Sequence, residues 1–163
     1  MELYLIRHGI ARDRRQWDGE EFERPLTEKG HLRTQQVAAR LKSLGLRFST
    51  LLTSPLTRAK QTAEILQEAG LGQSQDFSPL APEGRLEDWI EWYSQQAEES
   101  GGPIALVGHQ PDLGNWAEKL VWGENNAKLI LKKAGIIGIE FPADRPYLGH
   151  GQLFLLISPK WLL

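Results

Sequence analysis

Three short apolar runs, each followed at once by polar residues, most constrain what this 163-residue chain can fold into. The runs are residues 3–6, 48–53 and 104–107, and helix-like segments alternate with them. Short apolar runs between helical segments are typical of buried strands in a parallel sheet. The carboxyl ends of such strands lie along one edge, where α/β folds bind their ligands. We therefore expect the polar residues after the three runs to come together at that edge.

The segments between these runs carry signals for helix starts and stops. Thr27 is the expected N-cap of a helix that ends at Gly45, with Glu28 in its first turn. Ser54 followed by proline predicts a second N-cap, which places Arg58 in the first turn of that helix. Asp112 is the expected N-cap of a later helix, and Leu86 to Tyr93 keep the spacing of another. Residues 70–83, rich in Gly, Ser, Gln and Pro, are interpreted as a loop.

Two further apolar runs close the chain, at residues 136–141 and 153–157. The turn-like region 144–151 between them predicts an antiparallel pair at a sheet edge. The expected fold is therefore α/β with three αβα layers and a mostly parallel sheet that carries an antiparallel C-terminal pair. With 40% hydrophobic residues, the chain is expected to form a single domain over residues 1–163.

Composition excludes several classes of function. The chain has no cysteine, so disulfides, thiolate metal sites and cysteine nucleophiles are ruled out. A net charge of -2 provides no general basis for binding nucleic acid or an anionic membrane. No apolar run is long enough to cross a membrane, and the N-terminal run lacks the pattern of a signal peptide. The predicted location is the cytoplasm.

Residues 10–26 form a polar segment that is longer than most connections in a compact domain. It holds four arginines and five acidic residues. The arginines are Arg12, Arg14, Arg15 and Arg24, and the acids are Asp13, Asp18, Glu20, Glu21 and Glu23. Two interpretations stay open at this stage. The segment is either a lid or binding loop over a site, or a solvated surface loop.

Two arginines and two histidines at three expected strand ends indicate phosphate chemistry. Arg7 and Arg58 can clamp phosphoryl oxygens, and a protonated His109 can add a third donor. A neutral His8 can attack phosphorus in line and form a phosphohistidine that water later cleaves. Gly9 is expected to let the backbone approach the bound anion.

A metal site at His8 and His109 is the alternative interpretation of the same residues. The two neighbouring arginines would repel a divalent cation, and no third ligand has suitable spacing. We therefore expect a site that uses no metal and no cofactor.

Four blocks of the sequence resemble a known family. Arg7 to Gly9, Pro25 to Gly30, Ser54 to Ala63 and Val107 to His109 are similar, in order, to the signature blocks of the histidine phosphatase superfamily, which has the phosphoglycerate mutase-like fold. The short length, the Arg24 to Thr27 segment, the proline after the histidine block and the Ile157-Ser158-Pro159 ending resemble the SixA-like phosphohistidine phosphatases. The resemblance implies that His8 is the phosphorylated nucleophile and that Arg7, Arg58 and His109 form the phosphate pocket.

The resemblance leaves the proton donor and the substrate open. Many family members place a carboxylate donor between the third and fourth blocks, where Glu83 is the nearest candidate. A phosphoramidate substrate would not need one, because an imidazole leaving group can be protonated near neutral pH. The implied partner is a phosphorylated signalling protein of the histidine-containing phosphotransfer type, as in a phosphorelay. The alternatives are a phosphatase for small phosphate esters and a phosphate-binding module that has lost catalysis; oligomeric state is left open.

Overall fold

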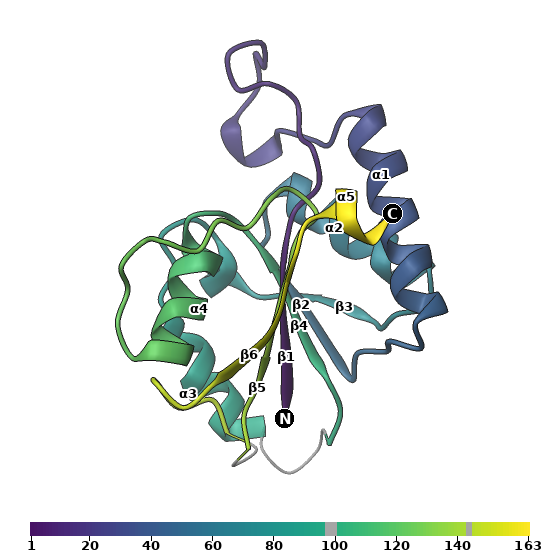
Figure 1. The fold of residues 1–163 in the computed structure, drawn as a ribbon. Helices are drawn as coiled ribbons and strands as arrows, with labels where there is room; N and C mark the ends of the chain where they lie inside the picture. The colour runs from purple at the N-terminus through teal and green to yellow at the C-terminus, as the bar shows by residue number, and fades with distance from the viewer. Residues whose placement is uncertain (97–100, 143–144) are drawn as a thin grey trace.

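The structure, a computed structural model, describes residues 1–96, 101–142 and 145–163, and its strands form one mixed sheet (Figure 1). The strands are β1 (Glu2–Arg7), β2 (Thr50–Thr53), β3 (Ser74–Asp76), β4 (Ile104–Gly108), β5 (Ile136–Glu140) and β6 (Gln152–Ile157). The α-helices are α1 (Glu28–Ser43), α2 (Thr57–Glu68), α3 (Leu86–Gln96), α4 (Asp112–Trp122) and α5 (Pro159–Leu162). Two short 3-10 helices, η1 (Glu21–Glu23) and η2 (Ser78–Leu80), complete the elements.

The sheet has the strand order β3-β2-β4-β1-β5-β6. Strands β1 to β4 pair in parallel, whereas β5 is antiparallel to both β1 and β6. Helices α1, α2 and α5 cover one face of the sheet, and α3 and α4 cover the other (Figure 1). The predicted α/β class, the three layers and the antiparallel C-terminal pair are confirmed. Residue 144, the first of the predicted turn 144–151, lies outside the described residues.

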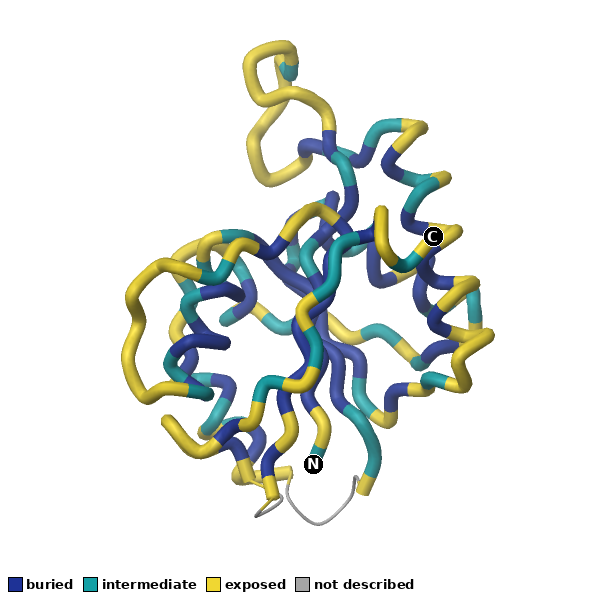
Figure 2. Tube along the Cα trace, in the orientation of Figure 1, coloured by how far each residue is buried: buried dark blue, intermediate teal, exposed yellow. Residues whose placement is uncertain are grey.

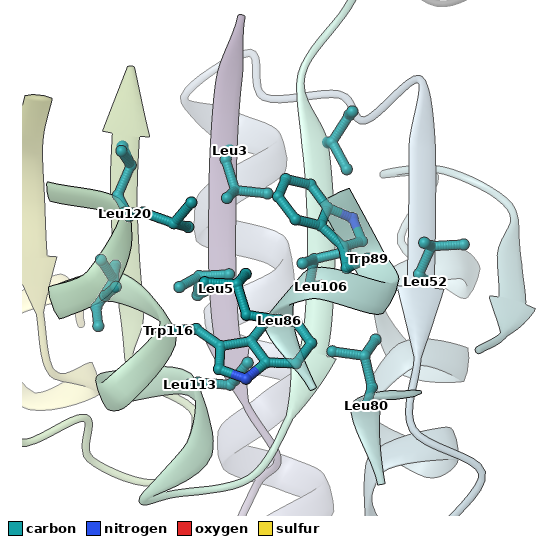
Figure 3. Packing of buried hydrophobic residues seen from close by; sticks show 14 of the residues in the cluster. Leu3, Leu5, Leu52, Leu80, Leu86, Trp89, Leu106, Leu113, Trp116 and Leu120 are labelled. Carbon is teal, nitrogen blue, oxygen red and sulfur yellow. The ribbon is translucent and has the colours of Figure 1, made fainter. Parts of the chain in front are cut away.

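Alternation along β1 supplies both faces of the core. Successive strand side chains point to opposite faces, so Leu3 and Leu5 pack with α3 and α4, whereas Tyr4 and Ile6 pack toward α1 and α2. Figure 3 shows Trp89 and Trp116 among the leucines of the first face. Both indoles are almost completely buried, as is the centre of the sheet (Figure 2). Trp89 and Trp116 therefore serve packing.

One of the three predicted helix caps is confirmed. The Thr27 hydroxyl accepts a hydrogen bond from Gly30 N at 2.9 Å and begins α1 as expected. The prediction for Ser54 was wrong, because α2 begins at Thr57 and Ser54 bonds a histidine instead. Asp112 is the first residue of α4 rather than its cap.

The predicted loop over residues 70–83 contains a strand and a short helix that the sequence pattern did not indicate. Ser74–Asp76 forms β3, which pairs in parallel with β2 at the sheet edge. Its residues are polar and lie at or near the surface, so they lack the apolar signal on which strand prediction depends.

Among the described residues, no helix has the length and apolar character needed to cross a membrane.

The pairing register aligns the carboxyl ends of three strands. Arg7 of β1 lies opposite Gly108 of β4, and Val107 of β4 lies opposite Thr53 of β2. Further backbone bonds continue both ladders, from His8 N to Gly108 O at 3.0 Å and from Ser54 N to Val107 O at 2.9 Å. The residues that follow β1, β2 and β4, which are His8, Ser54 and His109, are therefore held at the same edge.

A buried carboxylate fixes the segment between α4 and β5. Glu118 is 1% exposed and accepts hydrogen bonds from the backbone N–H groups of Asn126, Lys128 and Leu129. Three backbone donors thus depend on one side chain, since buried N–H groups without partners destabilise the folded state. The segment leads directly into residues 131–135, which lie beside the carboxyl end of β1.

We expect Glu118→Ala to lower the free energy of unfolding by about 2 to 3 kcal/mol, because it removes a buried acceptor that three backbone N–H groups share. The measurement is urea denaturation followed by tryptophan fluorescence. Glu124→Ala, which removes an exposed carboxylate from the same segment, is the control and should change stability by about 0.5 kcal/mol or less. Equal effects of the two substitutions would contradict this role for Glu118.

Candidate active site

A cavity of about 660 Å³ opens at the aligned carboxyl ends of β1 and β4. Its lining comes from the end of β1, the first turn of α2, the start of α4 and both ends of the 10–26 segment. The lining residues are Arg7, His8, Ala11, Arg12, Asp13, Arg14, Arg24, Arg58, Pro82, Glu83, His109, Gln110, Pro111, Asp112 and Lys133. Arg7, His8, Arg58 and His109, which the sequence predicts to converge, are all present.

His8 is held in one tautomer. Its Nδ1 lies 2.7 Å from the carbonyl oxygen of Gly9, and because a carbonyl only accepts, Nδ1 carries the proton. The lone pair is therefore on Nε2. Burial lowers the pKa of His8 well below the usual value; the bond to Gly9 opposes this, and the charges of Arg58 and Arg7 lower the pKa further. At neutral pH His8 is an uncharged imidazole with a free nitrogen lone pair.

His109 lies beside His8, with 5.3 Å between the ring centroids. Its Nε2 is 2.7 Å from the Ser54 hydroxyl, which also accepts a 3.3 Å bond from Leu56 N. Burial, followed by the charges of Arg58 and Arg7, lowers the pKa of His109 to about 3. The expectation of a protonated His109 is therefore wrong for this site at neutral pH. When the Ser54 hydroxyl donates to Nε2, the proton of the neutral ring is on Nδ1, which can then donate to an anion.

Arg7 and Arg58 carry the positive charge of the site. Arg7 donates from Nη1 to Leu131 O at 2.9 Å, and Arg58 donates from Nη1 to Glu21 O at 3.1 Å. Burial lowers the pKa of Arg58 to about 10, with Arg24 contributing, so the guanidinium stays charged at neutral pH. Within the part of the chain that the structure describes, Nε of both arginines and Nδ1 of His109 are buried without a hydrogen-bond partner. Three spare donors at one site favour an anionic ligand.

Glu21 ties the 10–26 segment to the site. Its carboxylate contacts three arginines, with Oε1 2.8 Å from Arg24, 3.3 Å from Arg58 and 3.4 Å from Arg14. The hydrogen bond from Arg24 lowers the pKa of Glu21 and outweighs the opposing effect of burial. The ends of the segment meet in a bridge between Ala11 and Leu26, while its tip is exposed (Figure 2). Its base therefore borders the cavity, as a binding loop would.

Gly9 does not line the cavity. A Cβ on Gly9 would lie 2.4 Å from the Thr34 hydroxyl, so glycine is required here by close packing against α1. The Gly9 N–H donates to Thr62 Oγ1 at 3.0 Å, and that hydroxyl donates to Arg58 O at 2.8 Å. Thr62 thus connects the backbone after His8 to the turn that carries Arg58.

Two carboxyl groups lie on the α4 side of the cavity. Glu83, the proton donor suggested by the sequence, lines the cavity, is exposed and has a positive φ of 67°. Its backbone N–H donates to the Asp112 carboxylate at 3.1 Å. Burial, and to a smaller extent the charge of Glu83, raises the pKa of Asp112 despite this bond. The structure therefore adds Asp112 as a second acidic group, which the sequence analysis had interpreted only as a helix cap.

Sequence reasoning missed the residues that support the four central side chains. Ser54 was interpreted as a helix cap because proline follows it, and Thr62 only as part of a buried helix face. Arg24 was treated as a loop charge, although it is 8% exposed. Among residues 1–96, 101–142 and 145–163, no group of three His, Asp or Glu side chains is arranged to hold a metal ion.

Comparisons with known proteins identify a family and relatives of this chain. The family described as histidine phosphatase superfamily (branch 1) matches residues 3–89 of the chain. An uncharacterised protein of Picosynechococcus sp. is 52% identical over 166 residues, covering 100% of this chain and 99% of that protein. A probable phosphoglycerate mutase of Cronobacter sakazakii is 40% identical, covering 93% of this chain and 70% of its own length.

A solved structure provides the comparison of folds. The protein histidine phosphatase SixA, in complex with tungstate, superposes with a TM-score of 0.85 at 23% identity. The match covers 100% of both chains. Since the identity is low, this likeness concerns the fold, including the sheet whose edge carries the cavity.

The low pKa of His109 predicts a specific loss of stability in acid. The folded-state value of about 3 lies below the ordinary value of 6.5, so folding favours the neutral ring. The resulting stabilisation is complete above about pH 6.5 and is lost as the pH falls toward the folded-state value. Between about pH 6 and pH 4.5, the stability advantage of the wild type over His109→Gln should shrink by about 1.4 kcal/mol per pH unit.

Urea denaturation across this pH range measures that difference. His150→Gln, which removes an exposed histidine outside the cavity lining, is the control. Parallel curves for the wild type and His109→Gln would show that His109 is not held neutral by the fold.

Proposed function

The chain belongs to the histidine phosphatase superfamily, and we propose that it hydrolyses phosphohistidine on a partner protein through a covalent intermediate at His8. Family membership supports phosphatase activity in general; the phosphohistidine substrate and the residue roles are the proposal. The observation that carries it is the tautomer of His8, whose Nδ1–H···O=C bond to Gly9 leaves Nε2 free. A neutral imidazole nitrogen beside two guanidinium groups is suited to attack a phosphoryl group.

The reaction proceeds in two displacements. Arg7, Arg58 and the Nδ1–H of His109 hold the phosphoryl oxygens, and His8 Nε2 attacks phosphorus opposite the leaving group. The new N–P bond forms as the bond to the leaving nitrogen breaks, and the leaving imidazole takes up a proton. A water molecule then attacks the phosphohistidine, and the N–P bond at His8 breaks. One proton of the water stays on the released phosphate, and the other goes to solvent and balances the proton that the leaving imidazole took up. His8 returns to its starting state, and no metal or cofactor takes part.

The acidic groups of the site distinguish kinds of leaving group. Glu83 lines the cavity and is exposed, so its carboxyl group can reach a leaving group but is not held in one orientation. Asp112, with its raised pKa, is a second candidate for that role. An alkoxide leaving group needs such a donor, whereas an imidazole can be protonated from solvent. A mobile Glu83 therefore suits a phosphoramidate, whereas a proton donated by Asp112 would favour an alkyl phosphate.

Two other functions remain as alternatives. The relative named a probable phosphoglycerate mutase favours a small phosphate ester as the second candidate substrate. A phosphate-binding module without catalysis is a third, but the convergence of all four predicted side chains argues against it. The similarity to a protein histidine phosphatase supports the first candidate, with a phosphotransfer protein of a phosphorelay as the partner. The cytoplasm stays the predicted location.

We expect the purified protein to release phosphate from a phosphorylated histidine-containing phosphotransfer domain with a kcat/KM at least about 100-fold above that for phosphoserine or 3-phosphoglycerate. His8→Ala should lower turnover on the order of 10⁴-fold, because it removes the nucleophile. Phosphate release, followed by ³¹P NMR, measures both.

The control is His150→Ala, which removes an exposed histidine outside the cavity lining and should retain wild-type turnover. A preference for the small esters would replace the proposed substrate while leaving the mechanism intact. Wild-type turnover by His8→Ala would refute the mechanism itself.

A further inference from the structure

A second cavity, of about 420 Å³, adjoins the first and is strongly basic. Its lining residues are Arg7, Ile10, Arg33, Lys132, Lys133, Ser158, Pro159 and Lys160. Five of these eight residues are arginine or lysine, and none is acidic. The chain as a whole carries a net charge of -2, so this concentration of positive charge is local.

The basic side chains come from three separate parts of the chain. Arg33 belongs to α1, Lys160 to α5, and Lys132 and Lys133 to the turn before β5. Helices α1 and α5 lie side by side near the carboxyl end of β1 (Figure 1). The charges are thus brought together by the tertiary fold, so a basic run in the sequence does not explain them.

The turn that carries the two lysines is fixed to the catalytic end of β1. Ala134 N donates to the carbonyl oxygens of both Arg7 and His8 at 3.1 Å, and Arg7 N donates to Gly135 O at 3.1 Å. Ala134 adopts a positive φ of 57°, which an alanine rarely does, and is 3% exposed. These hydrogen bonds therefore fix the backbone that carries Lys132 and Lys133 relative to His8.

The charge of Asp13, which lines the first cavity, acts on Lys133 but offsets only part of the positive charge of the second cavity. Over residues 1–96, 101–142 and 145–163, Arg33, Lys132, Lys133 and Lys160 form no ion pair with a carboxylate. Lys160 instead lies over the ring of Trp161, with its Nζ 4.8 Å from the ring centroid. A surface with an excess of like charge is less stable than a fully paired one, so an anionic ligand would gain favourable interactions here.

We propose that Arg33, Lys132, Lys133 and Lys160 form a second anion subsite, which binds a carboxylate or phosphate group carried by the same substrate whose phosphoryl group lies at His8. This inference rests on the proposed phosphatase function and adds a substrate class to it: phosphorylated molecules with a second anionic group. The link between the sites is structural, because Arg7 and Lys133 line both cavities. The second anion belongs either to a small ester or to an acidic side chain near the phosphohistidine of a protein.

The test combines three substitutions, Arg33→Gln, Lys132→Gln and Lys160→Gln, in one variant. Arg7 and Lys133 are left intact because they line the first cavity as well. One arm compares phenyl phosphate with 4-carboxyphenyl phosphate. The other compares phosphohistidine peptides flanked by glutamate with the same peptides flanked by glutamine. The charge-retaining variant Arg33→Lys, Lys132→Arg and Lys160→Arg is the matched control.

In at least one pair, we expect the triple glutamine variant to raise KM about fivefold to tenfold for the compound with a second anionic group. For the compound with the phosphoryl group alone, KM should rise less than about twofold. The charge-retaining variant should keep the wild-type preference. A selective effect in the ester arm assigns the second anion to a small molecule, and one in the peptide arm assigns it to a protein. Equal changes within both pairs, or no change in either, would overturn the subsite.

Binding to His8→Ala separates this inference from the proposed function. Calorimetry with the same compounds reports their affinity without turnover, in the presence and absence of the triple glutamine substitutions. If the wild type hydrolyses no compound but the affinity loss is selective for compounds with a second anionic group, the subsite stands and the phosphatase function fails. If hydrolysis proceeds but neither KM nor affinity changes selectively, the subsite fails alone.

Discussion

The register between β1, β4 and β2 is the constraint on which the site depends. Because Arg7 pairs with Gly108 and Val107 pairs with Thr53, the residue after each strand reaches the same edge. His8 and His109 are then neighbours despite about a hundred intervening positions, and their rings approach to 5.3 Å. A register shift of one residue would turn each following side chain to the opposite face of the sheet, and the cavity would lose its pair of histidines.

Burial among arginines determines the protonation of these two histidines. Desolvation and nearby positive charge both lower the pKa of His8 and of His109, so both rings are neutral at neutral pH. Hydrogen bonds then select the tautomers: the Gly9 carbonyl frees Nε2 of His8, and Ser54 is bonded to Nε2 of His109. One ring offers a lone pair, and its neighbour offers an N–H. Two histidines can thus be suited to different tasks, nucleophile and hydrogen-bond donor, because their other ring nitrogens bond different groups.

Much of this could be predicted from the sequence, and the failures have physical causes. The strands β1 and β4 and the first turn of α2 follow local patterns, so the positions of Arg7, His8, Arg58 and His109 could be predicted. Ser54 and Thr62 could not, because their hydroxyls bond partners 55 and 53 residues away along the chain, which no local pattern encodes. The protonation state of His109 also depends on charges from distant segments. The strand β3 was missed because it is polar and lies at the edge of the sheet.

The most direct measurement of the mechanism is the identity of the phosphorylated residue during turnover. The wild-type protein would be mixed with a phosphohistidine peptide, quenched within milliseconds in alkali, digested, and analysed by mass spectrometry. We predict a phosphoryl group on His8 that is stable in alkali, lost in acid, and absent once the substrate is consumed. A phosphoryl group on any other residue, or continued turnover with none on His8, would contradict covalent catalysis at this histidine.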